Sequence, residues 1–260
     1  MWMYLHQKNR IYWIILAEKL SLYPMQIIDS LVDPIINPTL IIGDFEWREP
    51  ITTLTDSLIA CVCIFAFIVF SRYKGEKSES FIYFKAFFLF FGIGMLCSAW
   101  LGHGLAAYLP PRVKVIGWVI NSAANLFLGL ATLREIIHLI KPHIRRLIKV
   151  IFIAQVSIFI VFMLIPSTSF FGLAQLCSLV SLIGMMLPMH IFNFSKTKSP
   201  GSKLFIIAIG MGVLPGIIFN TQLSVNRWFN YHDISHVVMA TIFFIIFLAA
   251  RKFSFLKQHT

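Results

Sequence analysis

The sequence is short of charge, and of acidic residues most of all. Only 13% of its 260 residues are charged, whereas a soluble domain carries roughly 25%. Asp and Glu together number 11, against 22 Lys and Arg, while 58% of the chain is hydrophobic. This composition excludes an ordinary soluble domain, and we predict that the chain is embedded in a lipid bilayer.

Cysteine is scarce as well. The four cysteines, Cys61, Cys63, Cys97 and Cys177, all lie inside apolar runs and show no metal-ligand spacing. Such residues are expected to act as small packing groups, because free cysteine behaves as a small hydrophobe. The sequence therefore indicates neither a disulfide framework nor a redox role.

The net charge of +11 does not indicate a nucleic-acid-binding protein. The basic residues fall in short connectors between apolar runs, which is how a polytopic membrane protein distributes them. We therefore expect no nucleic acid among the partners. The expected partner is the membrane lipid bilayer itself.

Long hydrophobic runs dominate the rest of the chain. Each is long enough to cross a hydrocarbon core of ~30 Å, which takes ~20 helical residues. The seven runs are 51–70, 81–103, 113–133, 147–165, 170–190, 203–220 and 231–250. Because they are continuous rather than alternating, they favour helices over barrel strands. We predict an all-α polytopic membrane protein with a seven-transmembrane helix bundle, kinked in its sixth helix at Gly210, Gly212, Pro215 and Gly216, with its phenylalanine-rich runs facing lipid.

These runs divide the chain into three parts. Residues 1–50 form an N-terminal interfacial or extramembrane segment, residues 51–252 the transmembrane domain, and residues 253–260 a cytoplasmic tail. A short apolar stretch at 11–17 predicts an interfacial helix, and both Met1 and Met25 remain open as the start. Most of the Lys and Arg residues fall on one side, which predicts an outside N-terminus and a cytoplasmic C-terminus.

Histidines supply the strongest functional signal. His232 and His236 lie one turn apart at the start of the seventh helix, and ionisable side chains are costly at membrane depth. At 1.5 Å per residue, His103 in the second helix and Asp56 in the first reach about the same depth below the outer interface. Asn121 in the third helix falls there too. His190 is expected to end the fifth helix on the inner side, and we exclude it from this site.

Three neutral imidazoles with an open fourth position form the ligand set of a catalytic zinc. We therefore predict Zn held by His103, His232 and His236, with Asp56, Asp233 and Asn121 as candidate partners of these ligands. Asp233 and His236 also share a helix face, so an Asp233 and His236 pair without His232 remains open.

A Ser and a His near the outer end of the second helix, followed by His-x-x-x-His on the seventh, resemble the pattern of the CREST superfamily. This superfamily comprises alkaline ceramidases, progestin and adiponectin receptors and related membrane hydrolases. The resemblance implies a zinc-dependent hydrolase of a lipid amide or ester, with Ser98, His103, His232 and His236 at the matching positions. The family spaces its Ser and His four apart rather than five, and its aspartate has no counterpart here. Asp56 or Asp233 would have to handle the proton, and Ser98 the oxyanion.

Two other classes of function remain open. A membrane transporter or channel would use the same intramembrane His and Asp residues, but it should also carry polar groups across the inner half. A non-catalytic membrane receptor or assembly protein would need no metal. The acidic residues Asp44, Glu46 and Glu49 are expected to form a solvated linker.

Overall fold

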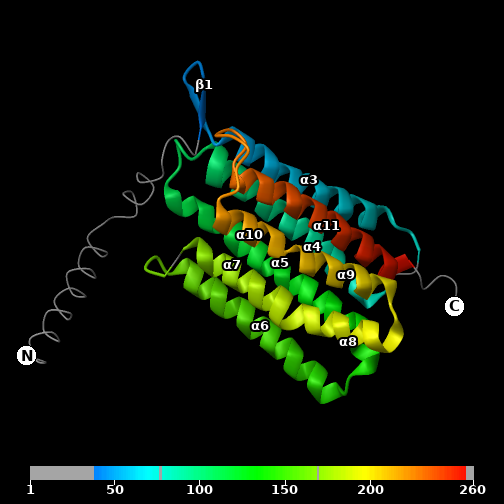
Figure 1. The fold of residues 1–260 in the computed structure, drawn as a ribbon. Coiled ribbons are helices and arrows are strands. Elements are labelled where there is room, and N and C mark those ends of the chain that lie inside the picture. The colour runs from blue at the N-terminus through cyan, green and yellow to red at the C-terminus, as the bar shows by residue number, and fades with distance from the viewer. Residues whose placement is uncertain (1–37, 76–77, 169, 256–260) are drawn as a thin grey trace, which may run out of the picture.

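Seven helical spans lie side by side in the computed structural model, which describes residues 38–75, 78–168 and 170–255 (Figure 1). The spans are Pro50–Arg72, Glu79–Gly104, Pro111–Glu135, Pro142–Leu164, Phe171–Thr197, Pro200–Thr221 and Tyr231–Phe253. Each is long and apolar enough to cross a membrane, so the chain is a multi-pass integral membrane protein with an all-α bundle. The predicted interfacial helix at 11–17 lies outside the described residues.

Several spans are built from more than one element. The elements are β1 (Thr39–Ile42), β2 (Phe45–Arg48), α3 (Pro50–Arg72), α4 (Glu79–Cys97), η1 (Ser98–Gly104), η2 (Pro111–Val113), α5 (Lys114–Glu135), η3 (Ile137–Leu139), α6 (Pro142–Leu164), α7 (Phe171–Leu179), η4 (Val180–Met186), α8 (Leu187–Thr197), α9 (Pro200–Met211), α10 (Val213–Thr221) and α11 (Tyr231–Phe255). The predicted break in the sixth span is confirmed, because α9 and α10 meet at Gly212. Two segments, η1 and η4, are π-helical.

Helix ends differ from the predicted ones where the helix continues through polar sequence. The helix α6 begins at Pro142 and not at 147, so Arg145 and Arg146 lie in its first turns and not in a loop. The fifth span likewise continues to Thr197, so the prediction that His190 ends this helix is wrong. Backbone groups in the interfacial region still gain from helical hydrogen bonds, and hydrophobicity alone therefore underestimates helix length.

The core consists of phenylalanine rings between α3, α4, α9 and α11. Phe70, Phe84, Phe87 and Phe88 are fully buried, and the ring of Phe91 lies 4.2 Å from that of Phe243 in α11. The expectation that the phenylalanine-rich runs face only lipid is therefore wrong. Large rings that interlock in this way hold helices together by contact area, since lipid provides little hydrophobic force between helices.

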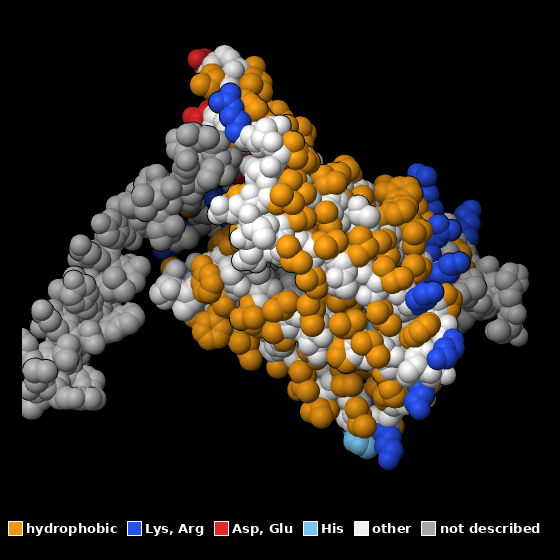
Figure 2. All heavy atoms as spheres, viewed as in Figure 1, with side chains coloured by type: hydrophobic (Ala, Val, Ile, Leu, Met, Phe, Trp, Pro, Cys, Tyr) orange, Lys and Arg blue, Asp and Glu red, His pale blue; other side chains and the backbone are white. Residues whose placement is uncertain are grey.

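The two ends of the bundle differ in chemistry (Figure 2). The antiparallel strands β1 and β2 form a hairpin that protrudes from one end, which we call the hairpin end. Lys and Arg side chains gather at the opposite end, which we call the basic end. Apolar side chains cover the surface between them in this view, as expected of a surface that faces hydrocarbon.

Close approach of α4 and α5 depends on glycine at one point. A Cβ at Gly117 would lie 3.0 Å from the carbonyl oxygen of Gly94 and would also collide with the hydroxyl of Ser98. By contrast, a Cβ at Gly216 in α10 would meet nothing within 4 Å. Gly117 thus allows the third span to pack directly on the second.

We predict that Gly117→Ala lowers the free energy of unfolding by about 1–3 kcal/mol, the usual cost of overpacking. The matched change Gly216→Ala should be neutral or slightly stabilising, because alanine favours a helix by up to about 1 kcal/mol over glycine. Thermal unfolding of both variants in detergent measures the difference. Equal melting temperatures for the two variants would contradict the close approach.

Candidate active site at the hairpin end

Glu49 joins the hairpin to the first membrane span and points its side chain into the bundle. Its backbone is left-handed, with φ 46° and ψ 54°, a conformation that costs a non-glycine residue free energy. Its carbonyl accepts the hydrogen bond of the Thr53 backbone N–H at 2.9 Å, which starts α3. Its carboxylate Oε2 lies 2.6 Å from Nδ1 of His103. Backbone strain at this turn therefore places a carboxylate on the predicted site histidine.

The hairpin is fastened to the end of the second span by aromatic stacking. Trp47 stacks on Trp100 with ring centroids 5.8 Å apart, and its Nε1 donates to the hydroxyl of Thr53 at 3.3 Å. Phe45 stacks on Tyr108, also at 5.8 Å. The Tyr108 hydroxyl accepts a hydrogen bond from the backbone N–H of Glu46 at 2.6 Å. These contacts fix the strand that leads into Glu49.

Burial and neighbouring charges shift the pKa of Glu49 in opposite directions. Burial raises the pKa of a carboxyl group, but attraction to His103, Lys114 and His232 outweighs it, so the pKa of Glu49 lies below its usual value of 4.5. The group is therefore an ionised acceptor, and the N–H on Nδ1 of His103 donates to it. This leaves Nε2 of His103 to face the interior.

Asp56 lies between two of the predicted histidines. Its Oδ2 is 3.7 Å from Nε2 of His103, and its Oδ1 is 3.2 Å from Nδ1 of His236. Nδ1 of His236 also lies 3.2 Å from the hydroxyl of Thr55. The expected proximity of Asp56, His103 and His236 is therefore observed. The Asp56 side chain is only 3% exposed, and its Oδ1 is buried without a hydrogen-bond partner among the described residues.

The π-helical geometry of η1 bears on the spacing of Ser98 and His103. A π-helix bonds each residue to the one five positions before it, and the Leu105 N–H donates to the Trp100 carbonyl in this pattern at 2.8 Å. Residues five apart therefore stack nearly above one another, as residues four apart do in an α-helix.

Asp233 makes its hydrogen bonds at the start of α11 and to α3. Its Oδ1 accepts from the Thr52 hydroxyl at 2.8 Å, and its Oδ2 accepts from the backbone N–H of Asn230 at 2.8 Å. The Asn230 side chain accepts in turn from the backbone N–H of His232 at 2.8 Å. This is the reciprocal cap of a helix N-terminus, and it also ties α11 to α3. Both carboxylate oxygens of Asp233 are thus engaged.

The remaining candidates lie in different surroundings. The ring of His232 packs against Phe219 at 5.2 Å between centroids, close enough to Glu49 and His103 to interact with them electrostatically. Ser98 faces Gly117, and Asn121 donates to the sulfur of Met95 at 3.4 Å. Neither Ser98 nor Asn121 hydrogen-bonds to the three histidines in the part of the chain that the structure describes. Asn121 is therefore a packing residue between α4 and α5, not a partner of these histidines.

Sequence reasoning missed Glu49, Thr52 and Thr55 as site residues. A signal was present, because Glu49, Thr52, Thr53 and Asp56 follow the i, i+3, i+4, i+7 spacing of one helix face in an otherwise apolar run. The expectation of a solvated linker is thus wrong for Glu49, whose side chain is 17% exposed.

The residues present fit a metal ion by their chemistry. A histidine that binds a metal through one ring nitrogen commonly donates its other N–H to a carboxylate, as His103 does to Glu49. Nδ1 of His236 lies 3.2 Å from Oδ1 of Asp56, but no hydrogen bond joins them, and this buried oxygen is unbonded among the described residues. Within the described ranges, no three His, Cys, Asp or Glu side chains already stand close enough together to hold an ion.

The chain belongs to a family of unknown function (DUF6962), which matches residues 51–254. Apart from Pro50, the matched range covers all seven spans, and it includes every site residue except Glu49. Comparison with curated proteins and with solved structures finds no match.

We predict that Glu49→Gln lowers stability at neutral pH by about 1–2 kcal/mol, since it removes a charge-assisted hydrogen bond to His103. The lowered pKa means that this contribution is present above pH 4.5 and is lost as the pH falls through the folded-state pKa. Wild type and variant should therefore converge in acid. Melting temperatures measured from neutral to acidic pH test this.

The matched control is Glu46→Gln, because Glu46 pairs with Arg48 on the exposed hairpin. This variant should melt within experimental error of the wild type throughout. A difference between Glu49→Gln and wild type that persists unchanged in acid would show that charge is not the cause.

Proposed function

We propose that this protein is a zinc-dependent intramembrane hydrolase that cleaves a lipid amide or ester. The observation that carries the proposal is the pairing of Glu49 with His103 and of Asp56 with His236 at one end of a lipid-embedded bundle. Buried carboxylates and histidines are expensive in a membrane protein and mark functional sites. The CREST-like pattern of Ser98, His103, His232 and His236 supports the same class.

The three histidines are the proposed zinc ligands. His103 and His236 each have Nδ1 beside a carboxylate, which leaves Nε2 as the metal-binding nitrogen, and His232 supplies the third imidazole. When bound, zinc polarises a carbonyl and brings the pKa of a coordinated water towards ~7. Glu49 holds the tautomer and the orientation of His103 in this arrangement.

Asp56 is the proposed general base and acid. It lies between His103 and His236, and its Oδ1 is free to accept a proton from water and to return it to the leaving group. We assign this role to Asp56 rather than to Asp233, because Oδ2 of Asp233 already caps α11 and its Oδ1 already accepts from the Thr52 hydroxyl of α3. The position of Ser98 against Gly117 also leads us to omit it from the oxyanion site.

The proposed substrate is a membrane amphiphile that reaches the site laterally. The helix α10 buries none of its residues and α7 buries only Cys177, so both expose apolar side chains to lipid in the half of the bundle near the hairpin. The concentration of Lys and Arg at the basic end supports the hairpin end as the outer one. A lipid of the outer leaflet would then place its headgroup linkage near the depth of Asp56.

Transport of protons or ions is the second candidate function. Polar groups do occur beyond the hairpin end: Gln155 accepts from Ser181 at 3.0 Å, and His190 lies 3.2 Å from the hydroxyl of Thr132 and 3.3 Å from that of Ser202. A transporter would need such groups across the bundle. They occur here in separate sets, each bonded within itself, so we place hydrolysis first. If the protein binds no metal, a non-catalytic receptor or assembly protein is the remaining hypothesis.

We predict that protein purified without chelators contains stoichiometric zinc, and that His236→Ala and His103→Ala lose it. His143→Ala should retain the metal, because His143 is exposed at the start of α6 near the basic end. Metal analysis by mass spectrometry on the folded variants provides the measurement. Metal-free wild-type protein would remove the basis of the hydrolase proposal.

We predict that Asp56→Asn lowers hydrolysis of fluorescent lipid amides or esters by about 10²–10⁴-fold, the usual contribution of a general base, while zinc content is kept. Asp233→Asn should instead lower the melting temperature, since it weakens a helix cap worth about 1 kcal/mol. Activity and melting temperature are measured on the same preparations. If Asp233→Asn abolishes activity in stable protein and Asp56→Asn does not, the two roles are reversed.

A further inference from the structure

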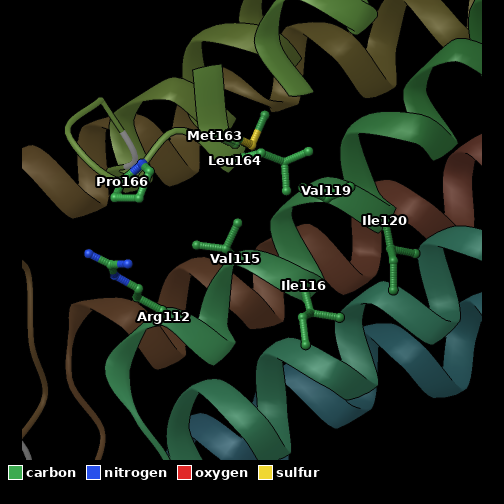
Figure 3. Close-up of a pocket in the computed structure, with 8 residues that line it drawn as sticks. All are labelled: Arg112, Val115, Ile116, Val119, Ile120, Met163, Leu164 and Pro166. Atoms are coloured by element: carbon green, nitrogen blue, oxygen red, sulfur yellow. The ribbon is translucent and has the colours of Figure 1, made fainter. Parts of the chain in front are cut away.

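A groove of about 380 Å³ opens on the side of the bundle between α5 and the end of α6 (Figure 3). Its walls are apolar except at one mouth, where Arg112 lies in η2. The apolar lining that matters here consists of Val115, Ile116, Val119 and Ile120 of α5, with Met163 and Leu164 of α6.

The lining follows one stripe of helix surface. Arg112, Val115, Ile116, Val119 and Ile120 are spaced i, i+3, i+4, i+7 and i+8, so they lie along one face. From Arg112 to Ile120 the stripe is about 12 Å long at 1.5 Å per residue. One leaflet of the hydrocarbon core is about 15 Å deep. The groove is therefore long enough to hold most of an acyl chain of that leaflet. The Arg112 guanidinium lies at the end where the lipid headgroup would be.

Arg112 differs from its basic neighbours at the hairpin end. Arg48 pairs with Glu46, Arg227 stacks on Trp228, and Lys114 interacts electrostatically with Glu49. Among the described residues, the side chain of Arg112 has no ion pair, hydrogen bond or ring contact. A guanidinium matches the geometry of phosphate oxygens and remains charged at the membrane surface. Its charge is therefore complementary to an anionic headgroup.

We propose that this groove binds one anionic phospholipid, with the phosphate on Arg112 and an acyl chain along the apolar stripe. The site is separate from the candidate active site, since Gly117 on another face of α5 packs on η1 while the groove faces α6. The proposal is independent of the hydrolase activity, because it requires neither zinc nor catalysis. A lipid held there joins α5 to α6, a helix that buries few of its own residues.

The test places a photoreactive diazirine amino acid at Ile116, which is 48% exposed in the groove. The full chain is reconstituted in phosphatidylcholine vesicles with a minority of phosphatidylglycerol, irradiated and analysed by mass spectrometry. The same amino acid at Ile217, 52% exposed on α10, is the lipid-facing control. Adducts at Ile217 should follow the bulk lipid ratio.

We expect phosphatidylglycerol adducts at Ile116 to be enriched about fivefold over the bulk ratio, which corresponds to about 1 kcal/mol for one basic residue near a headgroup. Arg112→Gln should abolish the enrichment, whereas the matched change Arg227→Gln should keep it. Adducts at the bulk ratio, enrichment that survives Arg112→Gln, or protein-to-protein adducts from a second copy would each overturn the proposal.

Discussion

The hydrogen bond between Glu49 and His103 is the contact on which the hairpin end depends. It joins the chain that precedes the first span to the end of the second, and the left-handed backbone at Glu49 is tolerated because this bond and the start of α3 both require it. The stacking of Trp47 on Trp100 joins the same two segments. Removing the Glu49 carboxylate would leave His103 without the partner that orients it. The strained backbone at Glu49 would then no longer be compensated by this hydrogen bond.

A second constraint is the depth at which Asp56 is buried. An ionisable group that is 3% exposed among lipid-facing helices must be compensated, and here the imidazoles of His103 and His236 lie beside its carboxylate. Asp233 is compensated differently, by a helix cap and a threonine hydroxyl. Two carboxylates within one bundle therefore have different surroundings. Asp56 has an oxygen without a hydrogen bond among the described residues, whereas both oxygens of Asp233 are hydrogen-bonded.

Much of this organisation could be read from local sequence. The seven spans follow from runs of apolar residues, and the shared depth of Asp56, His103 and His236 follows from counting residues along three helices. The β-hairpin and the left-handed turn at Glu49 did not follow, since strands of four residues and one backbone angle leave no periodic pattern. Asn121 lay at a suitable depth but faces Met95, because depth along a helix does not determine which face a residue occupies.

The π-helical segment η1 determines the direction in which His103 points. In an ordinary α-helix from Ser98 to Gly104, His103 would lie about 140° around the axis from Ser98. The five-residue hydrogen bonding of η1 changes this rotation, and His103 faces Glu49 and Asp56. Such bulges are common at functional sites, because they redirect one side chain without breaking the helix. The geometry of His103 is therefore set by backbone bonding within the second span as much as by the carboxylates that meet it.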